Sequence, residues 1–163
     1  MSDYYVKHLH VTLSLEHAST IIDAALRCGR TQKLLPLAVA VLDAGGHLVA
    51  FQREDGCGIM RGDIATGKAW GALGMGVSSR TIRDRLAERI AFQSALANVS
   101  QGKFVPVPGG VLICTADNTV IGAVGISGDA SDKDEYCAIE AVKAAGHTPH
   151  PQHAAEGWKD AGL

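Results

Sequence analysis

The sequence predicts an α+β fold in which helices cover an antiparallel sheet. One observation is that β-rich runs occur in adjacent pairs joined by short turns, at residues 43–46 and 117–118, which is typical of β-hairpins. The second is that segments with helical periodicity precede, separate and follow these pairs. A Rossmann-type parallel sheet would instead alternate single strands with helices. The four predicted strands are 36–43, 47–53, 110–115 and 120–126.

The first elements of the chain have recognisable boundaries. Residues 8–13 (HLHVTL) alternate in type and predict a short edge strand. Ser14 is a suitable N-cap for the helix that follows, and Gly29 a suitable stop. The run 36–43 is apolar on both faces, so we expect it in the centre of the sheet.

A glycine-rich segment, RGDIATGKAWGALGMG, occupies residues 61–76. Its apolar residues repeat at helical spacing, yet each glycine costs about 1 kcal/mol relative to alanine in a helix interior. Such a helix is expected where its backbone must come close to another element or to a ligand. The glycines within the predicted helix are Gly62, Gly67, Gly71 and Gly74.

The remaining helices follow from capping residues. After Ser78 and Ser79, residues 80–100 predict one broken helix or two short ones. Ser131 predicts the cap of a final helix that ends near Ala145. The acidic residues Asp132, Asp134 and Glu135 would favour the dipole of that helix.

Composition limits the classes of function. The 163 residues suit one domain, 1–163, whose C-terminal tail is 146–163. The net charge of −2 and scattered basic residues give no footprint for nucleic acid. No apolar run reaches the roughly 18 residues that a membrane span needs. The N-terminus lacks a basic region followed by an apolar one, so no signal peptide is expected and the predicted location is cytoplasmic.

The four cysteines are too widely spaced for a zinc or iron–sulfur motif. Cys28, Cys114 and Cys137 fall in apolar segments and are expected to be buried, reduced thiols. Cys57 lies in a loop and is the one cysteine whose position suggests reactivity.

Four residues form a candidate anion-binding site. Gly109 and Gly110 lie where a proline-stiffened loop enters a strand, and consecutive glycines can present backbone N–H groups to a carboxylate or phosphate. The alternative is a bulge that re-aims the strand. Lys68 lies among small residues of the glycine-rich helix, and Arg80 near the start of the next helix. The alternative for these two is a solvated surface pair.

The histidines suggest a metal ligand. His17 falls in the first turn of the first helix, where it is either a surface residue or an accessible ligand. His147, His150 and His153 recur at three-residue spacing in the tail. A polyproline-like conformation would align them on one edge, and the alternative is a flexible polar tail.

The segments IATGKAWGALGMG and VPVPGGVLICTADNTVIGAVGISGDASDKDEYCAIEAVKAAG resemble the GlcG/HbpS family, which includes the C-terminal domain of the PduO-type adenosyltransferases. The resemblance extends from the first helix to about Gly146. It implies a profilin-like α-β-α sandwich with a five-stranded antiparallel sheet flanked by helices. It also implies homo-oligomers, for which the glycine and alanine stripe of the second helix would leave apolar surface.

The resemblance leaves two hypotheses for function. The first is a protein that binds haem or a related tetrapyrrole non-covalently, with His17 as axial ligand and Lys68 or Arg80 pairing a propionate. No CxxCH motif is present, so covalent attachment is not expected. The second is a tautomerase, isomerase or hydrolase that acts on a small carboxylate metabolite in a catabolic pathway. Gly109 and Gly110 would then stabilise an oxyanion, and Lys68 would act as an acid or electrostatic stabiliser.

Overall fold

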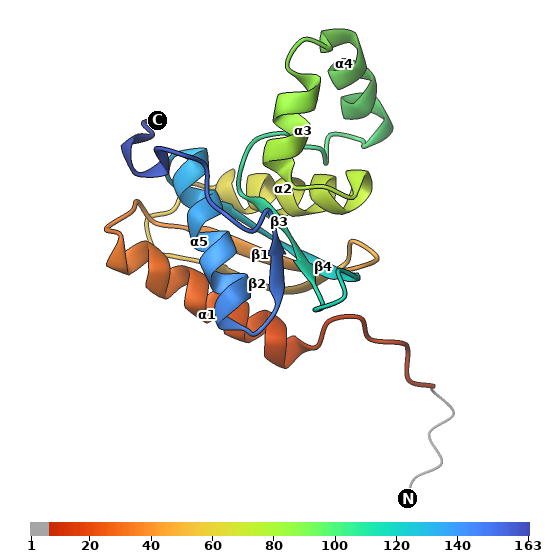
Figure 1. Ribbon diagram of the computed structural model, residues 1–163, viewed down its shortest axis with the longest axis vertical. Coiled ribbons are helices and arrows are strands. Elements are labelled where there is room, and N and C mark those ends of the chain that lie inside the picture. The colour runs from red at the N-terminus through yellow and green to blue at the C-terminus, as the bar shows by residue number, and fades with distance from the viewer. Residues whose placement is uncertain (1–6) are drawn as a thin grey trace, which may run out of the picture.

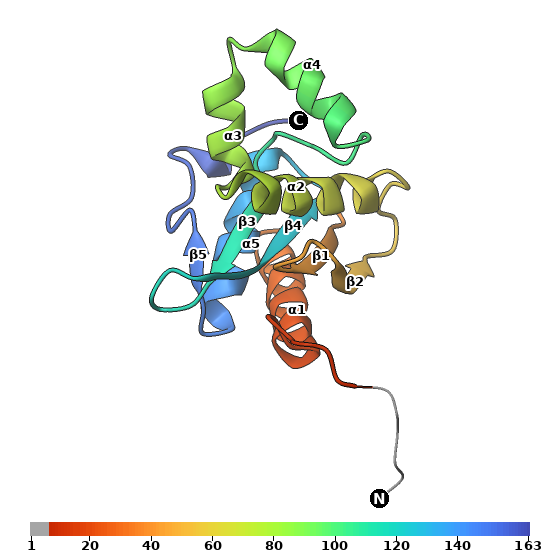
Figure 2. The same ribbon diagram turned by 90° about the vertical axis from the view of Figure 1, so that its right-hand side faces the viewer.

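The computed structural model describes residues 7–163 and contains a five-stranded antiparallel sheet with helices on both faces (Figures 1 and 2). The strand order is β2-β1-β4-β3-β5, so the predicted sheet is confirmed and the run expected in its centre lies between two neighbours. The strands are β1 (Ala38–Asp43), β2 (Leu48–Arg53), β3 (Gly110–Cys114), β4 (Val120–Ser127) and β5 (Thr148–His150). The helices are α1 (Leu15–Thr31), α2 (Arg61–Met75), α3 (Ser79–Leu86), α4 (Ile90–Val99), α5 (Ser131–Ala144) and the short 3-10 helix η1 (Trp158–Asp160).

The two faces of the sheet carry side chains of different size. Figure 2 shows α2 on one face and α1 with α5 on the other. Successive side chains of a strand point to opposite faces, so the two faces can differ in composition. The residues of β1 and β4 that pack with α1 and α5 are β-branched. Most residues opposite α2 are small. The first set in β1 and β4 is Val39, Val41, Val124 and Ile126, and the second is Ala38, Ala40, Ala123 and Gly125.

Glycines allow the backbone of α2 to lie directly on the sheet. A Cβ added to Gly125 of β4 would overlap the carbonyl oxygen of Ala65, and one added to Gly110 would overlap that of Lys68. On the other side of the helix, a Cβ on Gly71 would lie 3.0 Å from the Phe104 ring. These glycines of α2 and of the strands therefore allow two elements of the protein to approach closely. The sequence predicted close approach either to another element or to a ligand.

The predicted edge strand at residues 8–13 is wrong. This segment is irregular. Within it, the Leu13 side chain is buried, and the Thr12 hydroxyl accepts a hydrogen bond from the N–H of Ala44. The fifth strand is β5, which lies in the C-terminal tail and pairs with β3. The tail is thus part of the sheet.

Two predicted helix boundaries are also corrected. Helix α1 continues past Gly29 to Thr31. Gly29 is instead buried against Leu37, whose Cδ1 would lie 2.6 Å from an added Cβ. Ser131 is the first residue of α5, and its side chain does not cap the helix. The carboxylate of Asp129 instead accepts the N–H of Ala130.

Helices α3 and α4 form an arm, residues 79–99, that extends away from α2 (Figure 1). None of the residues of α4 is buried. Its exposed apolar side chains include Ile90 and Val99, at 73% and 82% exposure. Within residues 7–163, no helix is both long and apolar enough to cross a membrane.

The close approach of α2 predicts different outcomes for two glycine-to-alanine changes. Gly125→Ala should lower the free energy of unfolding by about 3 kcal/mol, because the methyl group must displace a helix backbone. Gly74→Ala, on the exposed side of α2 with its nearest neighbour 4.0 Å away, should raise it by up to about 1 kcal/mol. Urea denaturation of both variants checks this. Equal stability of the two would contradict it.

Candidate functional site

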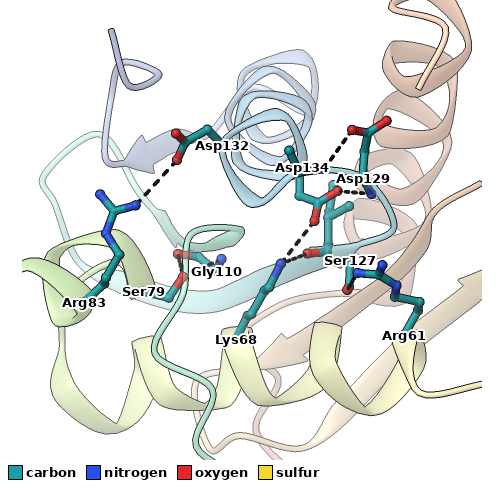
Figure 3. Close-up of polar contacts among 11 residues, drawn as sticks. Arg61, Lys68, Ser79, Arg83, Gly110, Ser127, Asp129, Asp132 and Asp134 are labelled. Atoms are coloured by element: carbon teal, nitrogen blue, oxygen red, sulfur yellow. Dashed lines mark hydrogen bonds and ion pairs between the residues drawn. The ribbon is translucent and has the colours of Figure 1, made fainter. Parts of the chain in front are cut away.

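Lys68 forms a buried ion pair that joins α2, on one face of the sheet, to α5 on the other (Figure 3). The residue is 1% exposed, and its Nζ lies 3.1 Å from Oδ2 of Asp134 in the first turn of α5. Nζ also donates to the carbonyl oxygen of Ile126 at 2.9 Å. The other carboxylate oxygen of Asp134 accepts the N–H of Asp129 at 3.0 Å. Lys68 thus reaches from α2 past the sheet into the opposite layer.

Burial and the opposite charge of the partner have opposing effects on the pKa of each group in this pair. Burial lowers the pKa of Lys68, and the carboxylate of Asp134 opposes that change. Burial raises the pKa of Asp134 to about 6, against the influence of the ammonium group. The attraction between the two groups, and the hydrogen bonds that each makes, therefore offset part of the cost of burying them.

Arg80 lies against a second buried carboxyl group. Its Nε is 3.2 Å from Oε2 of Glu135, whose side chain is fully buried, and its Nη2 donates to the carbonyl of His153 at 2.7 Å. Among residues 7–163, neither carboxyl oxygen of Glu135 has a partner with hydrogen-bond geometry. Burial raises the pKa of Glu135 to about 7, with Arg80 opposing the change. Arg80 thus holds α5 and the C-terminal tail.

The glycine pair predicted to face an anion faces the protein instead. The N–H of Gly110 donates to Oγ of Ser79 at 2.7 Å. Gly109 has a φ of 122°, and its added Cβ would lie 2.9 Å from Nζ of Lys68. The carbonyl of Gly109 accepts the N–H of Ile126. The structure brings Gly109, Gly110 and Lys68 together as expected, but the N–H of Gly110 and the ammonium of Lys68 are hydrogen-bonded within the protein.

A histidine pair lies at the other end of α5. Nδ1 of His17 is 2.9 Å from Nε2 of His147, and the two residues are 130 positions apart in sequence. His17 is exposed, whereas His147 is partly buried, which together with the nearby His17 lowers its pKa. His150 lies in β5, opposite Leu112. Among the described contacts of the three tail histidines, it is the ring of His147 that meets His17.

Helix α5 separates the two sets of candidate residues. Asp134 lies in its first turn, and His147 follows its end at Ala144. At a rise of 1.5 Å per residue, Asp134 and Ala144 are about 15 Å apart along the axis. The haem hypothesis expected His17 to lie close to Lys68 and Arg80. The structure does not bring these residues together.

The acidic partners were the part of the site that sequence reasoning missed. A signal was present, because Lys68 lies within the helical stripe of Ala65, Ala69 and Ala72, which marks a buried face. Lysine is almost never fully buried without a partner, so a carboxylate was required nearby. The position of Asp134 and Glu135 at the start of a helix favours an interpretation through the helix dipole and does not point to Lys68. No sequence signal indicates that His147 approaches His17.

Comparison with known proteins gives the family. Residues 13–143 match the family described as haem degrading protein HbpS-like. The chain belongs to this HbpS-like family. It is 29% identical over 135 residues to the corrinoid adenosyltransferase PduO of Salmonella typhimurium, and this covers 82% of the chain but only 39% of PduO. An uncharacterized 15.0 kDa protein from Citrobacter freundii is 30% identical over 66% of the chain and 75% of its own length.

Solved structures of HbpS-like relatives share the fold. A structure of a PduOC:heme complex superposes with a TM-score of 0.74 at 26% identity, covering 86% of this chain and 99% of that one. The Klebsiella pneumoniae protein ORFY gives a TM-score of 0.75 at 25% identity, with 90% and 97% coverage. HbpS itself gives 0.72 at 25% identity, with 90% and 98% coverage. The HbpS-like fold therefore spans most of the chain.

The buried position of Lys68 predicts a structural role with a measurable size. Lys68→Ala should lower the free energy of unfolding by about 3–5 kcal/mol, because it leaves Asp134 buried without its counterion. Lys143 provides a matched control, since it forms an exposed ion pair with Glu140, and both residues lie in α5. Lys143→Ala should change stability by no more than about 0.5 kcal/mol. Denaturation by urea measures both, and a similar small loss for the two variants would refute the role.

Proposed function

We propose that this protein binds haem non-covalently, with the imidazole of His17 as an iron ligand. The observation that carries the proposal is the contact between Nδ1 of His17 and Nε2 of His147. Iron-bound and zinc-bound histidines usually donate the N–H of their second ring nitrogen to a neighbouring acceptor. The similarity to the PduOC:heme complex supports the same ligand.

The two imidazoles fit this role chemically. The lowered pKa of His147 favours its neutral form, which has one ring nitrogen that can accept a hydrogen bond. If His147 Nε2 accepts, His17 carries its proton on Nδ1 and its Nε2 lone pair is free for iron. Haem would supply the iron ion that this nitrogen binds. His147 would then hold the His17 ring in one orientation.

The chain just before His17 carries exposed apolar side chains. Leu9 and Val11 lie on the segment that leads into α1, and Leu15 is its first residue. These side chains are 87%, 65% and 63% exposed. Because these residues are close to His17 in sequence, we expect them to offer apolar area to a porphyrin rather than to a small hydrophilic metabolite.

Haemin titration followed by absorption spectroscopy tests the proposal. The protein should give a sharp Soret band that His17→Ala abolishes while the circular dichroism spectrum is unchanged. His147→Ala should retain the band but weaken binding by about 10–100-fold, because the second nitrogen of His17 loses its acceptor. His47→Ala, a change of an exposed histidine in the β1–β2 turn, should bind as the unaltered protein does. An unchanged band in His17→Ala would overturn the proposal.

We also propose that the protein is a homo-oligomer in which a second copy covers α4. The stripe on α2 that the sequence suggested for this role is buried against the sheet. Apolar side chains are instead exposed around α4, where Met75, Leu96 and Val99 line a 120 Å³ hollow together with Trp70 and Phe104. Monomeric proteins rarely leave a continuous apolar patch uncovered.

Light scattering measures this assembly. The protein should be oligomeric at micromolar concentration, and Val99→Asp should shift it to smaller species. Ile59→Asp, at an equally exposed apolar residue on the segment before α2, should leave the mass unchanged. A stable monomer of the unaltered protein would contradict the proposal.

A further inference from the structure

A hollow lies between α2 and the turn at residues 100–103 that follows α4. Its volume is about 290 Å³, and the residues that line it include Asp63, Thr66 and Trp70 of α2 and Lys103 of the turn. The turn packs closely on the helix at Gly67, where an added Cβ would lie 2.8 Å from the carbonyl oxygen of Lys103. A space of this size is at the lower end of the range for ligand pockets, so it fits one small molecule.

The helical repeat arranges the wall that α2 contributes. Asp63, Thr66 and Trp70 are three and four residues apart, so their side chains share one face of the helix. The seven residues from Asp63 to Trp70 span about 10 Å along the helix axis. The wall therefore has a carboxylate near the start of α2 and an indole ring about two turns later.

Two opposite charges of this hollow are not neutralised by the protein. Among residues 7–163, neither Asp63 nor Lys103 forms an ion pair. Both residues are exposed. Nζ of Lys103 lies 5.7 Å from the centroid of the Trp70 ring, so the ammonium group and the indole ring are at the same end. Asp63 is at the other end.

The indole ring of Trp70 is held by packing and remains partly exposed. A Cβ added to Gly46, in the β1–β2 turn, would lie 3.3 Å from Cδ1 and Nε1 of the ring. A ring positioned in this way offers flat apolar area to a ligand without a large loss of side-chain entropy. Trp70 also borders the hollow beside α4 that we assign to a second copy, but that hollow extends toward Gly74 and Met75 at the end of α2.

We propose that the hollow between α2 and residues 100–103 binds a small aromatic carboxylate that carries an amino group at the opposite end of its ring. The ring of the ligand stacks on Trp70, and its carboxylate pairs with the ammonium group of Lys103. Its amino group donates a hydrogen bond to the carboxylate of Asp63. Because Lys103 is exposed and has a flexible stem, it can leave the ring face to the ligand and remain beside the ligand's carboxylate.

This site is separate from the proposed haem site. Helix α2 covers one face of the sheet, and α1, which carries His17, covers the other (Figure 2). Binding of an aromatic carboxylate therefore does not depend on the histidine pair.

Nuclear magnetic resonance with 4-aminobenzoate as the probe tests the proposal. The chain has two tryptophans and so gives two indole N–H signals. The signal of Trp70 should shift, whereas that of Trp158, which stacks on Tyr136 with ring centroids 3.7 Å apart, should not. The dissociation constant should be about 0.01–1 mM, as expected for a ligand of about ten non-hydrogen atoms. A Trp70 signal that does not move at about 10 mM probe would overturn the proposal.

Two simpler probes test the contacts at the ends of the ring. Benzoate lacks the amino group, and aniline lacks the carboxylate. Each should bind about 2–5-fold more weakly than 4-aminobenzoate, because one exposed polar contact is lost. Binding of either compound as tightly as 4-aminobenzoate would contradict the proposed recognition.

A matched pair of variants shows whether the position of Lys103 matters. Lys103→Glu should weaken 4-aminobenzoate binding about 10-fold, since repulsion replaces attraction. Lys159 also lies over a tryptophan ring, 5.5 Å from the centroid of Trp158, and Lys159→Glu should leave the affinity unchanged. Trp70→Ala should weaken binding about 10-fold through loss of the stacking surface. An unchanged affinity in Lys103→Glu, or an equal loss in Lys159→Glu, would overturn the proposal.

Discussion

The close approach between α2 and the sheet is the constraint on which the rest of the structure depends. Helix and sheet normally keep a layer of large side chains between them. Here Gly110 and Gly125 let the strand backbone touch the carbonyls of Lys68 and Ala65. This contact costs helix propensity within α2, and close packing offsets that cost. It also carries Lys68 near enough to the sheet for its side chain to reach the far layer.

The buried ion pair follows directly from that approach. Lys68 extends beside Gly109, whose φ of 122° and missing Cβ leave space for the ammonium group, and meets Asp134. Removing two charges from water is expensive, so the pair is stable only because Ile126 and Asp129 complete its hydrogen bonds. The same residues that suggested an anion site in the sequence therefore hold the two layers of the fold together.

The sequence was sufficient for the elements whose signals are local. Both hairpins were predictable because turn chemistry and β-rich runs occur side by side, and α2 was predictable from its period despite its glycines. Strand β5 was not, because three residues that include Pro149 carry no strand pattern, and their pairing with β3 is set by the tertiary fold. The direction in which the glycine pair faces was likewise undetermined, since a nest and a close contact require the same residues.

The candidate haem site depends on a contact that only the folded chain creates. Antiparallel packing of α1 on α5 brings the start of one helix to the end of the other, and His17 thereby meets His147. A crystal structure of the protein grown with haemin is the most direct test of this account. It should show iron bound to Nε2 of His17, with Nδ1 still against His147 and the Lys68–Asp134 pair intact. Iron bound elsewhere, with that ion pair opened to receive a propionate, would contradict it.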